Sequence, residues 1–460
     1  MSQPQPTVSV PTAAPAAPAA EAAPAEGRLP RRLGTWSAAA VVVGMIIGSG
    51  IFRVPATAAA EVGAVGAMLA LWVLGGAIAS SGSLAVAELA AMFPRAGGIF
   101  VYLRETYGPL PAFLFGWTDF LIVRPGTSAA VALIFTAYLG HFVPLAPGTQ
   151  RVIGAALIVL FSAANYRSVR GAALVQNASS AAKLVALLGL ALAILLFGRP
   201  QEGAFAGPIS FAPATWGGFG VALIAVMWAY DGWADVASLT GEVRDPGRAL
   251  PRGIMLGMAG VIAAYLAANV AYLWVLPARA MAGSELVAAD AATRALGDVG
   301  GALISALVML STVGTLNANV MTGPRFVWAM ADEDLFFRRL AAVHPRFRTP
   351  HVAIAVSCLL ALVYISSQTF EQLTNAIVLG EWPFYALAVA AVAILRRRLP
   401  DHPRPYRSPA SPWLPAAFVA GSLALLLNSL VETPALTLVS FAVILSGLPV
   451  YAVWRSRAAP

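Results

Sequence analysis

Two short polar stretches interrupt otherwise apolar runs, and both contain residue types that suit ligand binding. The first reads GMIIGSGIF, at Gly44–Phe52, and the second reads WAYDGWAD, at Trp228–Asp235. Glycine destabilises a helix interior by roughly 1 kcal/mol relative to alanine, and serine favours caps and turns because its hydroxyl competes for backbone groups. The two stretches therefore predict interruptions in two helices, each with free backbone N–H and C=O groups.

An interruption of this kind can hold the two charged groups of an α-amino acid. A half-helix that starts after the Gly48–Gly50 turn presents N–H groups and the positive end of its dipole, which suit a carboxylate. The preceding half-helix ends in free carbonyl groups, which suit an ammonium group, and the Trp228–Asp231 stretch can supply more of them. Trp228 or Tyr230 can close over the ligand. These residues predict an amine-and-carboxylate site and leave the ligand's side chain undetermined.

Helix packing is the alternative interpretation of the first stretch. Gly44 and Gly48 have the GxxxG spacing by which membrane helices approach each other closely. Packing accounts for two glycines four residues apart. It accounts neither for the Ser49-Gly50 pair nor for a second interruption later in the chain, and we therefore favour binding.

The composition indicates that membrane-spanning helices position these stretches. Apolar residues make up 59% of the 460 residues, charged residues make up 11%, and the mean hydropathy is +0.77; a soluble domain has about 25% charged residues. Twelve apolar runs that suit membrane spans are predicted, at 35–61, 66–92, 109–138, 150–165, 171–197, 216–241, 252–277, 299–330, 351–367, 373–395, 412–430 and 434–454. The interruptions fall in the first and sixth spans, which is typical of two five-helix repeats of inverted topology with a binding site near mid-membrane.

The basic residues predict the orientation of the chain. Most arginines fall in loops that share one side of the membrane if the N-terminus is cytoplasmic, which is the positive-inside pattern. The net charge of +8 is thus a membrane feature and no sign of nucleic-acid binding. We expect a multi-pass protein of a bacterial cell (inner) membrane with both termini in the cytoplasm. The first 27 residues lack the basic start and apolar core of a signal peptide, and their Ala- and Pro-rich composition predicts a disordered tail.

The sequence offers few residues for catalysis or metal chemistry. Cys358 is the single cysteine, so a disulfide framework and a cysteine metal site are excluded. The single lysine, Lys183, follows an alanine, so the Walker A motif is absent, and the four histidines form no HExxH motif. We expect no enzyme activity, no metal and no cofactor. A channel would need a continuous polar or charged lining, whereas the polar positions here cluster at two interruptions.

Five stretches resemble, in order, signature stretches of the amino acid–polyamine–organocation superfamily: GMIIGSGIF, AMFPRAGGIFVYLRETYG, LIVRPGTSAAVAL, WAYDGWADVASLTGEVRDPGRALPRGI and LNANVMTGPRFVWAMADED. Val123–Gly126 and the sixth span most resemble its bacterial L-type amino acid transporters. The resemblance runs from about Arg32 to Arg407 and implies an all-α integral membrane protein with the leucine-transporter fold and twelve transmembrane helices. Its implied parts are a cytoplasmic tail (1–30), a first five-helix repeat (31–199), a second five-helix repeat (200–398) and two additional helices with a cytoplasmic C-terminus (399–460).

The resemblance also implies which residues form the site. The expected substrate-binding set is Ile46, Gly48, Ser49, Gly50, Ile51, Trp228, Ala229 and Asp231. Trp228 stands where the family usually has a phenylalanine gate, so we expect it to act as the gate here. The larger ring leaves open which side chains are accepted.

Lys183, in the fifth predicted span, is a candidate for a cation-site substitute. In sodium-independent members of the family, the matching lysine stands where sodium sits in sodium-coupled relatives, so the resemblance implies no sodium coupling. Ser311 and Thr312 of the eighth span match positions near the coupling cation and are expected to face Lys183. The alternative is a lysine whose long side chain extends to the inner membrane face.

Charged residues elsewhere in the spans are further candidates. Asp119 and Arg124, five residues apart, suit a pair whose role is structural or functional. By the resemblance, Glu88 lies near an inner gate, and Glu381 lies near the side-chain end of the pocket.

The sequence thus predicts a sodium-independent secondary transporter of neutral L-amino acids that exchanges them by alternating access. The alternatives are a proton-coupled amino acid symporter and, from another class, an amino acid sensor that does not transport. The expected partners are the amino acid substrate and the lipid bilayer. By the resemblance, eukaryotic relatives join a heavy chain through a cysteine between spans three and four. That stretch here, LGHFVPLAPGTQR, has none, so no disulfide-linked heavy chain is expected.

Overall fold

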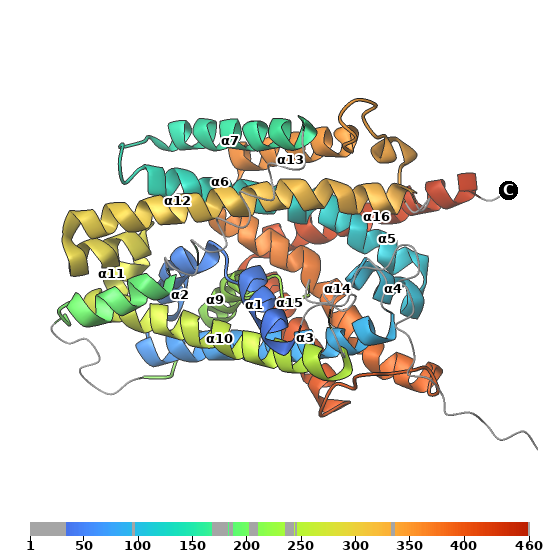
Figure 1. The fold of residues 1–460 in the computed structure, drawn as a ribbon, viewed down its shortest axis with the longest axis horizontal. Coiled ribbons are helices and arrows are strands. Elements are labelled where there is room, and N and C mark those ends of the chain that lie inside the picture. The colour runs from blue at the N-terminus through green and yellow to red at the C-terminus, as the bar shows by residue number, and fades with distance from the viewer. Residues whose placement is uncertain are drawn as a thin grey trace, which may run out of the picture.

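The computed structural model describes residues 34–93, 97–167, 183, 187–201, 210–234, 243, 246–332 and 336–458. All elements of this part of the chain are helices (Figure 1). The predicted N-terminal tail, most of the first part of the fifth span and the second part of the sixth span lie outside the described residues.

The helices follow the predicted spans closely in most places. The α-helices are α1 (Thr35–Ile46), α2 (Val54–Val62), α3 (Val65–Met92), α4 (Ile99–Tyr107), α5 (Pro109–Thr118), α6 (Arg124–Leu139), α7 (Pro147–Arg167), α9 (Trp216–Ala229), α10 (Pro246–Val275), α11 (Ala278–Ala282), α12 (Val287–Asp332), α13 (His351–Ser367), α14 (Phe370–Arg398), α15 (Trp413–Glu432) and α16 (Pro434–Ala458). Short helical turns are η1 (Gly50–Phe52), η2 (Asp119–Val123) and η4 (Arg338–Ala341). The π-helical turn η2 joins α5 to α6, and α12 contains a kink at Gly297, where φ is 73°.

Eight helices of the described chain are long and apolar enough to cross a membrane. Four shorter apolar helices fall in the predicted spans one, five, six and nine: Thr35–Ile46, Leu187–Phe197, Trp216–Ala229 and His351–Ser367. The first of these, α1, has 12 residues. It is therefore about 18 Å long at 1.5 Å per residue, shorter than the roughly 30 Å hydrocarbon core. α1 can complete a crossing only with the chain that follows its interruption.

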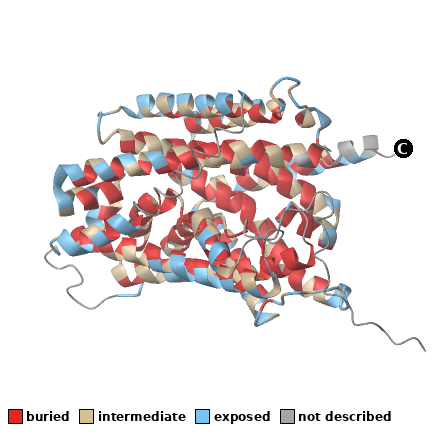
Figure 2. Cartoon of the chain, in the orientation of Figure 1, coloured by how far each residue is buried: buried red, intermediate tan, exposed pale blue. Residues whose placement is uncertain are grey.

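Helices of the first half pack against helices of the second half. α3 lies against α10, α6 against α12, and α7 against α13, while α1 runs along α10. Figure 1 shows α7 and α13 outside α6 and α12 at one edge, and α3 and α10 at the opposite edge. α1, α2 and α9 lie between these layers, where most residues of α2 and α9 are buried and α1 buries Ala38, Ala39, Val42 and Ile46 (Figure 2). The interrupted helices therefore lie at the centre of the molecule.

A proline explains the irregular turn between α5 and α6. Pro125 has no N–H to give to the Leu121 carbonyl four residues earlier, and the Tyr364 hydroxyl of α13 donates to that carbonyl at 2.7 Å instead. Asn319 of α12 donates to the Arg124 carbonyl at 2.7 Å. Tyr364 thus donates to the carbonyl whose helical donor the proline removes, and Asn319 ties the neighbouring Arg124 carbonyl to α12.

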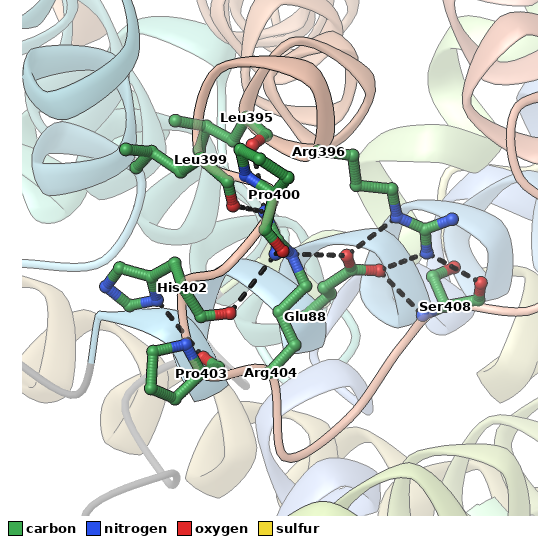
Figure 3. Close-up of polar contacts among 9 residues, drawn as sticks. All are labelled: Glu88, Leu395, Arg396, Leu399, Pro400, His402, Pro403, Arg404 and Ser408. Carbon is green, nitrogen blue, oxygen red and sulfur yellow. Dashed lines mark hydrogen bonds and ion pairs between the residues drawn. The ribbon is translucent and has the colours of Figure 1, made fainter.

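A buried carboxylate anchors the end of α14 to α3 (Figure 3). Glu88 of α3 is fully buried and accepts hydrogen bonds from Arg396 Nε at 2.8 Å and Arg396 Nη2 at 2.6 Å. It also accepts one from the backbone N–H of Ser408 at 2.7 Å, and Arg404 Nε lies 3.8 Å from its Oε1. One negative charge therefore holds two guanidinium groups and the chain between α14 and α15.

Arg404 extends this anchor to the last turn of α14. Its Nη2 donates to the carbonyls of Leu395 and Leu399 at 2.8 and 2.7 Å, and such terminal carbonyls lack intrahelical partners. Burial raises the pKa of the nearby Tyr406 hydroxyl to about 12, and the charge of Glu88 acts in the same direction. The connection from α14 to α15 is thus part of the packed structure.

Replacing the Glu88 carboxylate should destabilise the fold. Glu88→Gln keeps the shape but leaves two guanidinium groups without their counter-charge, and breaking a buried ion pair costs about 3–5 kcal/mol. We expect a clear fall in the melting temperature of the purified protein in detergent. Asp298→Asn, at an exposed carboxylate, is the matched control and should melt like the parent. Equal melting of the two variants would contradict the anchor.

Candidate substrate-binding site

The first interruption lies within the stretch predicted from glycine and serine. α1 ends at Ile46, and Ile47 is extended, with φ of −67° and ψ of 100°. The chain then bends through Gly48 and Ser49 into the 3₁₀ turn η1, before α2 begins at Val54. Ile46, Ser49, Gly50 and Ile51 are buried, whereas Gly48 is half-buried.

The second interruption lies at the end of α9. A Thr215 hydroxyl caps the start of this helix by accepting from the Gly218 N–H at 3.0 Å, and the helix ends at Ala229. The chain turns at Asp231 and Gly232, and Gly232 has a φ of 101°, which favours glycine. The helix therefore ends within the stretch where the sequence predicts a break, and the rest of the sixth span lies outside the described residues.

The two interruptions contact each other through backbone and glycine. A Cβ added at Gly50 would lie 3.0 Å from the Ala229 Cα and 3.2 Å from the Trp228 ring. A Cβ added at Gly232 would lie 2.7 Å from the Met45 carbonyl oxygen. Each interruption thus needs a glycine where the other packs against it, and the predicted residues of the two spans come together.

A layer of aromatic and charged side chains covers the interruptions on the α2 side. The Trp228 ring packs edge-on against Phe370 of α14, with centroids 5.3 Å apart. The Arg53 guanidinium lies 5.6 Å from the Phe370 ring centre and donates to Glu371 at 3.0 Å. Beyond this layer, Arg53, Phe370 and Glu371 line a cavity of about 240 Å³. The sequence analysis identified Trp228 but not Phe370, because no motif around Phe370 indicates that its ring contacts Trp228.

A second cavity, of about 220 Å³, lies beside the interruption of the sixth span. Asp231 and Ala234 line it together with Asp119, Arg124 and Glu381. Arg124 Nε donates to both Asp119 oxygens, at 3.1 and 3.3 Å, so the predicted pair forms. The expected residues of the first interruption are packed within the protein and are not among the described residues that line this cavity.

Lys183 contacts α12, the helix that carries Ser311 and Thr312. The lysine is 5% exposed, and its Nζ donates to the Thr315 hydroxyl at 2.7 Å. Thr315 in turn donates to the Ser311 carbonyl at 3.2 Å, whereas the Thr312 hydroxyl donates to Met309 within its own helix. Among the described residues, Lys183 thus has Thr315 as its side-chain partner, which the sequence analysis did not identify. Its spacing of four from Ser311 places it on the same helix face and was the available signal.

Interrupted apolar helices that meet at the centre of a helical membrane protein are typical of secondary transporters. The family model for amino acid permeases matches residues 33–454. The chain belongs to this amino acid permease family, within the amino acid–polyamine–organocation superfamily that the motifs resemble.

Individual relatives are similar along almost the whole chain. The serine/threonine exchanger SteT of Bacillus subtilis is 32% identical over 94% of this chain and 98% of its own length. The b(0,+)-type amino acid transporter 1 of Homo sapiens is 31% identical over 88% of this chain and 84% of its own. The large neutral amino acids transporter small subunit 2 of Mus musculus is 32% identical over 92% of this chain and 81% of its own length. These relatives are amino acid transporters and exchangers.

The contact between the interruptions predicts a difference between two glycines of one motif. A methyl group at Gly50 must push Ala229 away, whereas one at Gly44 meets nothing within 4 Å. Gly50→Ala is expected to weaken amino acid binding about tenfold, while Gly44→Ala should bind within about twofold of the parent. The stabilisation of the purified variants by neutral L-amino acids on heating measures both. Unchanged binding by Gly50→Ala would refute the assignment.

Proposed function

We propose that this protein is a sodium-independent secondary transporter that exchanges neutral L-amino acids by alternating access. The observation that carries the proposal is the meeting of two interrupted helices through Gly50 and Gly232 at the centre of the molecule. Free helix ends at that depth offer charge-complementary backbone groups without a charged side chain. The names of the relatives support amino acids as the substrate class.

The proposed architecture has twelve spans, with five-helix repeats at 31–199 and 200–398 and two further helices at 399–460. The packing of α3 on α10, α6 on α12 and α7 on α13 supports it, because each pair joins helices that correspond five spans apart. Both termini are proposed to be cytoplasmic, in the inner membrane of a bacterium. No disulfide-linked heavy chain is proposed, since the stretch between α6 and α7 has no cysteine.

The proposed site uses backbone on both sides of the interruptions. Amides of Ser49 and Gly50 face the substrate carboxylate, and the carbonyls of Ile46 and Ala229, at the ends of α1 and α9, face its ammonium group. Trp228 is the gate, and its contact with Phe370 closes the α2 side. The rest of the proposed site surface is formed by Ile51, Gly48 and Asp231.

Proton-coupled uptake is the second candidate, and one observation favours it. Asp231 and Glu381 both line the cavity beside the sixth-span interruption, and intramembrane carboxylates commonly act in proton relays. Exchange requires an amino acid on the far side of the membrane, whereas symport requires a proton gradient across it.

Reconstitution separates these functions. Liposomes that contain the purified protein should take up labelled neutral L-amino acid only when they are loaded with unlabelled amino acid, because an exchanger returns to the outside with substrate bound. Sodium should not change the rate. Uptake into empty liposomes under a pH gradient would indicate symport instead, and saturable binding without uptake would indicate a sensor.

Lys183 is proposed to replace a coupling cation through its contact with α12. Lys183→Ala leaves the half-buried Thr315 hydroxyl without this donor, so we expect transport to fall about tenfold. Lys183→Arg should rescue poorly, because a planar guanidinium does not reproduce a compact ammonium group. Thr322→Val, which removes a more exposed hydroxyl from the same helix, is the control. Equal transport rates of Lys183→Ala, Lys183→Arg and the parent between about pH 5 and pH 9 would instead favour a lysine whose side chain only extends to the membrane face.

A further inference from the structure

We infer that a groove between α3, α9 and α15 binds one phospholipid whose headgroup carries a free ammonium group, as phosphatidylethanolamine does. The groove encloses about 550 Å³ and is lined by residues within 74–81 of α3, 216–223 of α9 and 414–428 of α15. Its described lining is apolar apart from Ser81 and Asn428. Such a site is independent of the proposed transport, because lipid binding needs no amino acid substrate.

Small residues of α15 leave room in the groove for an acyl chain. Ala417, Gly421 and Ala424 follow one another at spacings of four and three, which places them on one helix face. A Cβ added at Gly421 would meet nothing within 4 Å. The lining of α15 runs from Leu414 to Asn428, a length of about 21 Å at 1.5 Å per residue. Half of the roughly 30 Å hydrocarbon core is shorter than this, so an acyl chain of one leaflet fits along the groove.

Two carboxylates lie at the end of the groove where α9 begins. A Cβ added at Gly217 would contact the Glu432 carboxylate of α15, and one added at Gly218 would lie 3.3 Å from Glu61 Oε2 of α2. Asn428, which lines the groove, donates to the Gly217 carbonyl at 3.2 Å. The charges of Glu61 and Glu432 repel each other, and within the described part of the chain no arginine forms an ion pair with either. A lipid ammonium group supplies the missing positive charge.

The start of α9 suits the phosphate of the same headgroup. This helix has 14 residues and begins at Trp216, so its first N–H groups and its dipole favour an anion. Trp216 is 77% exposed, and tryptophan side chains in membrane proteins concentrate at the level of the headgroups. Acyl chains are as apolar as the groove, so the headgroup contacts must select the lipid. Phosphatidylglycerol lacks the ammonium group, and the quaternary ammonium of phosphatidylcholine has no N–H donor.

The groove lies next to the interruption of the sixth span. Phe418, a buried residue of its lining, packs edge-on against Trp233 with ring centroids 5.5 Å apart. Trp233 directly follows Gly232, which lies against the Met45 carbonyl of the first interruption. The lipid therefore contacts α9 directly, and it contacts the chain after α9 through Phe418.

Thermal stabilisation of the purified full-length protein in detergent tests the headgroup contacts. Dioleoyl-phosphatidylethanolamine should give half of its maximal stabilisation at a concentration about tenfold lower than the phosphatidylcholine or phosphatidylglycerol with the same acyl chains. In the double variant Glu61→Gln and Glu432→Gln this preference should shrink to less than about twofold, because neutral amides attract an ammonium group less strongly. Asp298→Asn, at an exposed carboxylate outside the groove, should keep the preference. Equal responses of the parent to the three lipids, or an unchanged preference in the double variant, would overturn the inference.

Gly421→Leu tests the groove, because it places a branched side chain in the space for the acyl chain. The variant should require about tenfold more dioleoyl-phosphatidylethanolamine for the same stabilisation. Gly189→Leu adds the same side chain at an exposed glycine outside the groove, where a Cβ also meets nothing within 4 Å, and should respond within about twofold of the parent. An unchanged response of Gly421→Leu would overturn the inference. A dimer of the parent that Gly421→Leu dissociates would also overturn it, since a second copy of the chain would then occupy the groove.

Discussion

Backbone groups at the two helix interruptions need partners, and this need organises the centre of the protein. In a membrane interior, irregular backbone is tolerated only where protein or a water-filled cavity surrounds it. Tyr265 reaches the carbonyls of Ile46 and Ala229, and Tyr138 of α6 donates to the Phe52 carbonyl at 2.8 Å. Intact helices therefore supply donors to the carbonyls of the interrupted ones.

The same solution recurs away from the interruptions, where Tyr364 serves the Leu121 carbonyl that Pro125 leaves without a donor. Tyrosine suits this task because its apolar ring packs between helices and its hydroxyl reaches a polar group at the far end. Charged groups follow a different rule. Glu88 lies at one end of α3 among two arginines, and Arg53 pairs with Glu371. Full ion pairs thus hold connections between helices, whereas neutral hydroxyls serve the helix breaks.

The interruptions also separate two unlike sides. On the α2 side, Trp228, Phe370 and Arg53 form a packed layer. Next to the sixth-span interruption lies a cavity of about 220 Å³ that Asp231 and Glu381 line. A cavity of about 240 Å³ also lies on the α2 side, next to Arg53 and Phe370, so there is space on both sides of the interruptions. Membership of the amino acid permease family agrees with this arrangement.

The sequence by itself determined that the chain is helical and apolar and where two helices break, because glycine, serine and proline act on the backbone at their own positions. α1 and α9 end within the predicted stretches, at Ile46 and Ala229. The same local rules said nothing about which distant side chains complete the site. Tyr265 lies 219 residues from Ile46, and Thr315 and Phe370 also come from helices far along the chain. The position of a hydroxyl on an apolar helix does not indicate which carbonyl will accept its hydrogen bond. Only the packing of the helices therefore decided those partners.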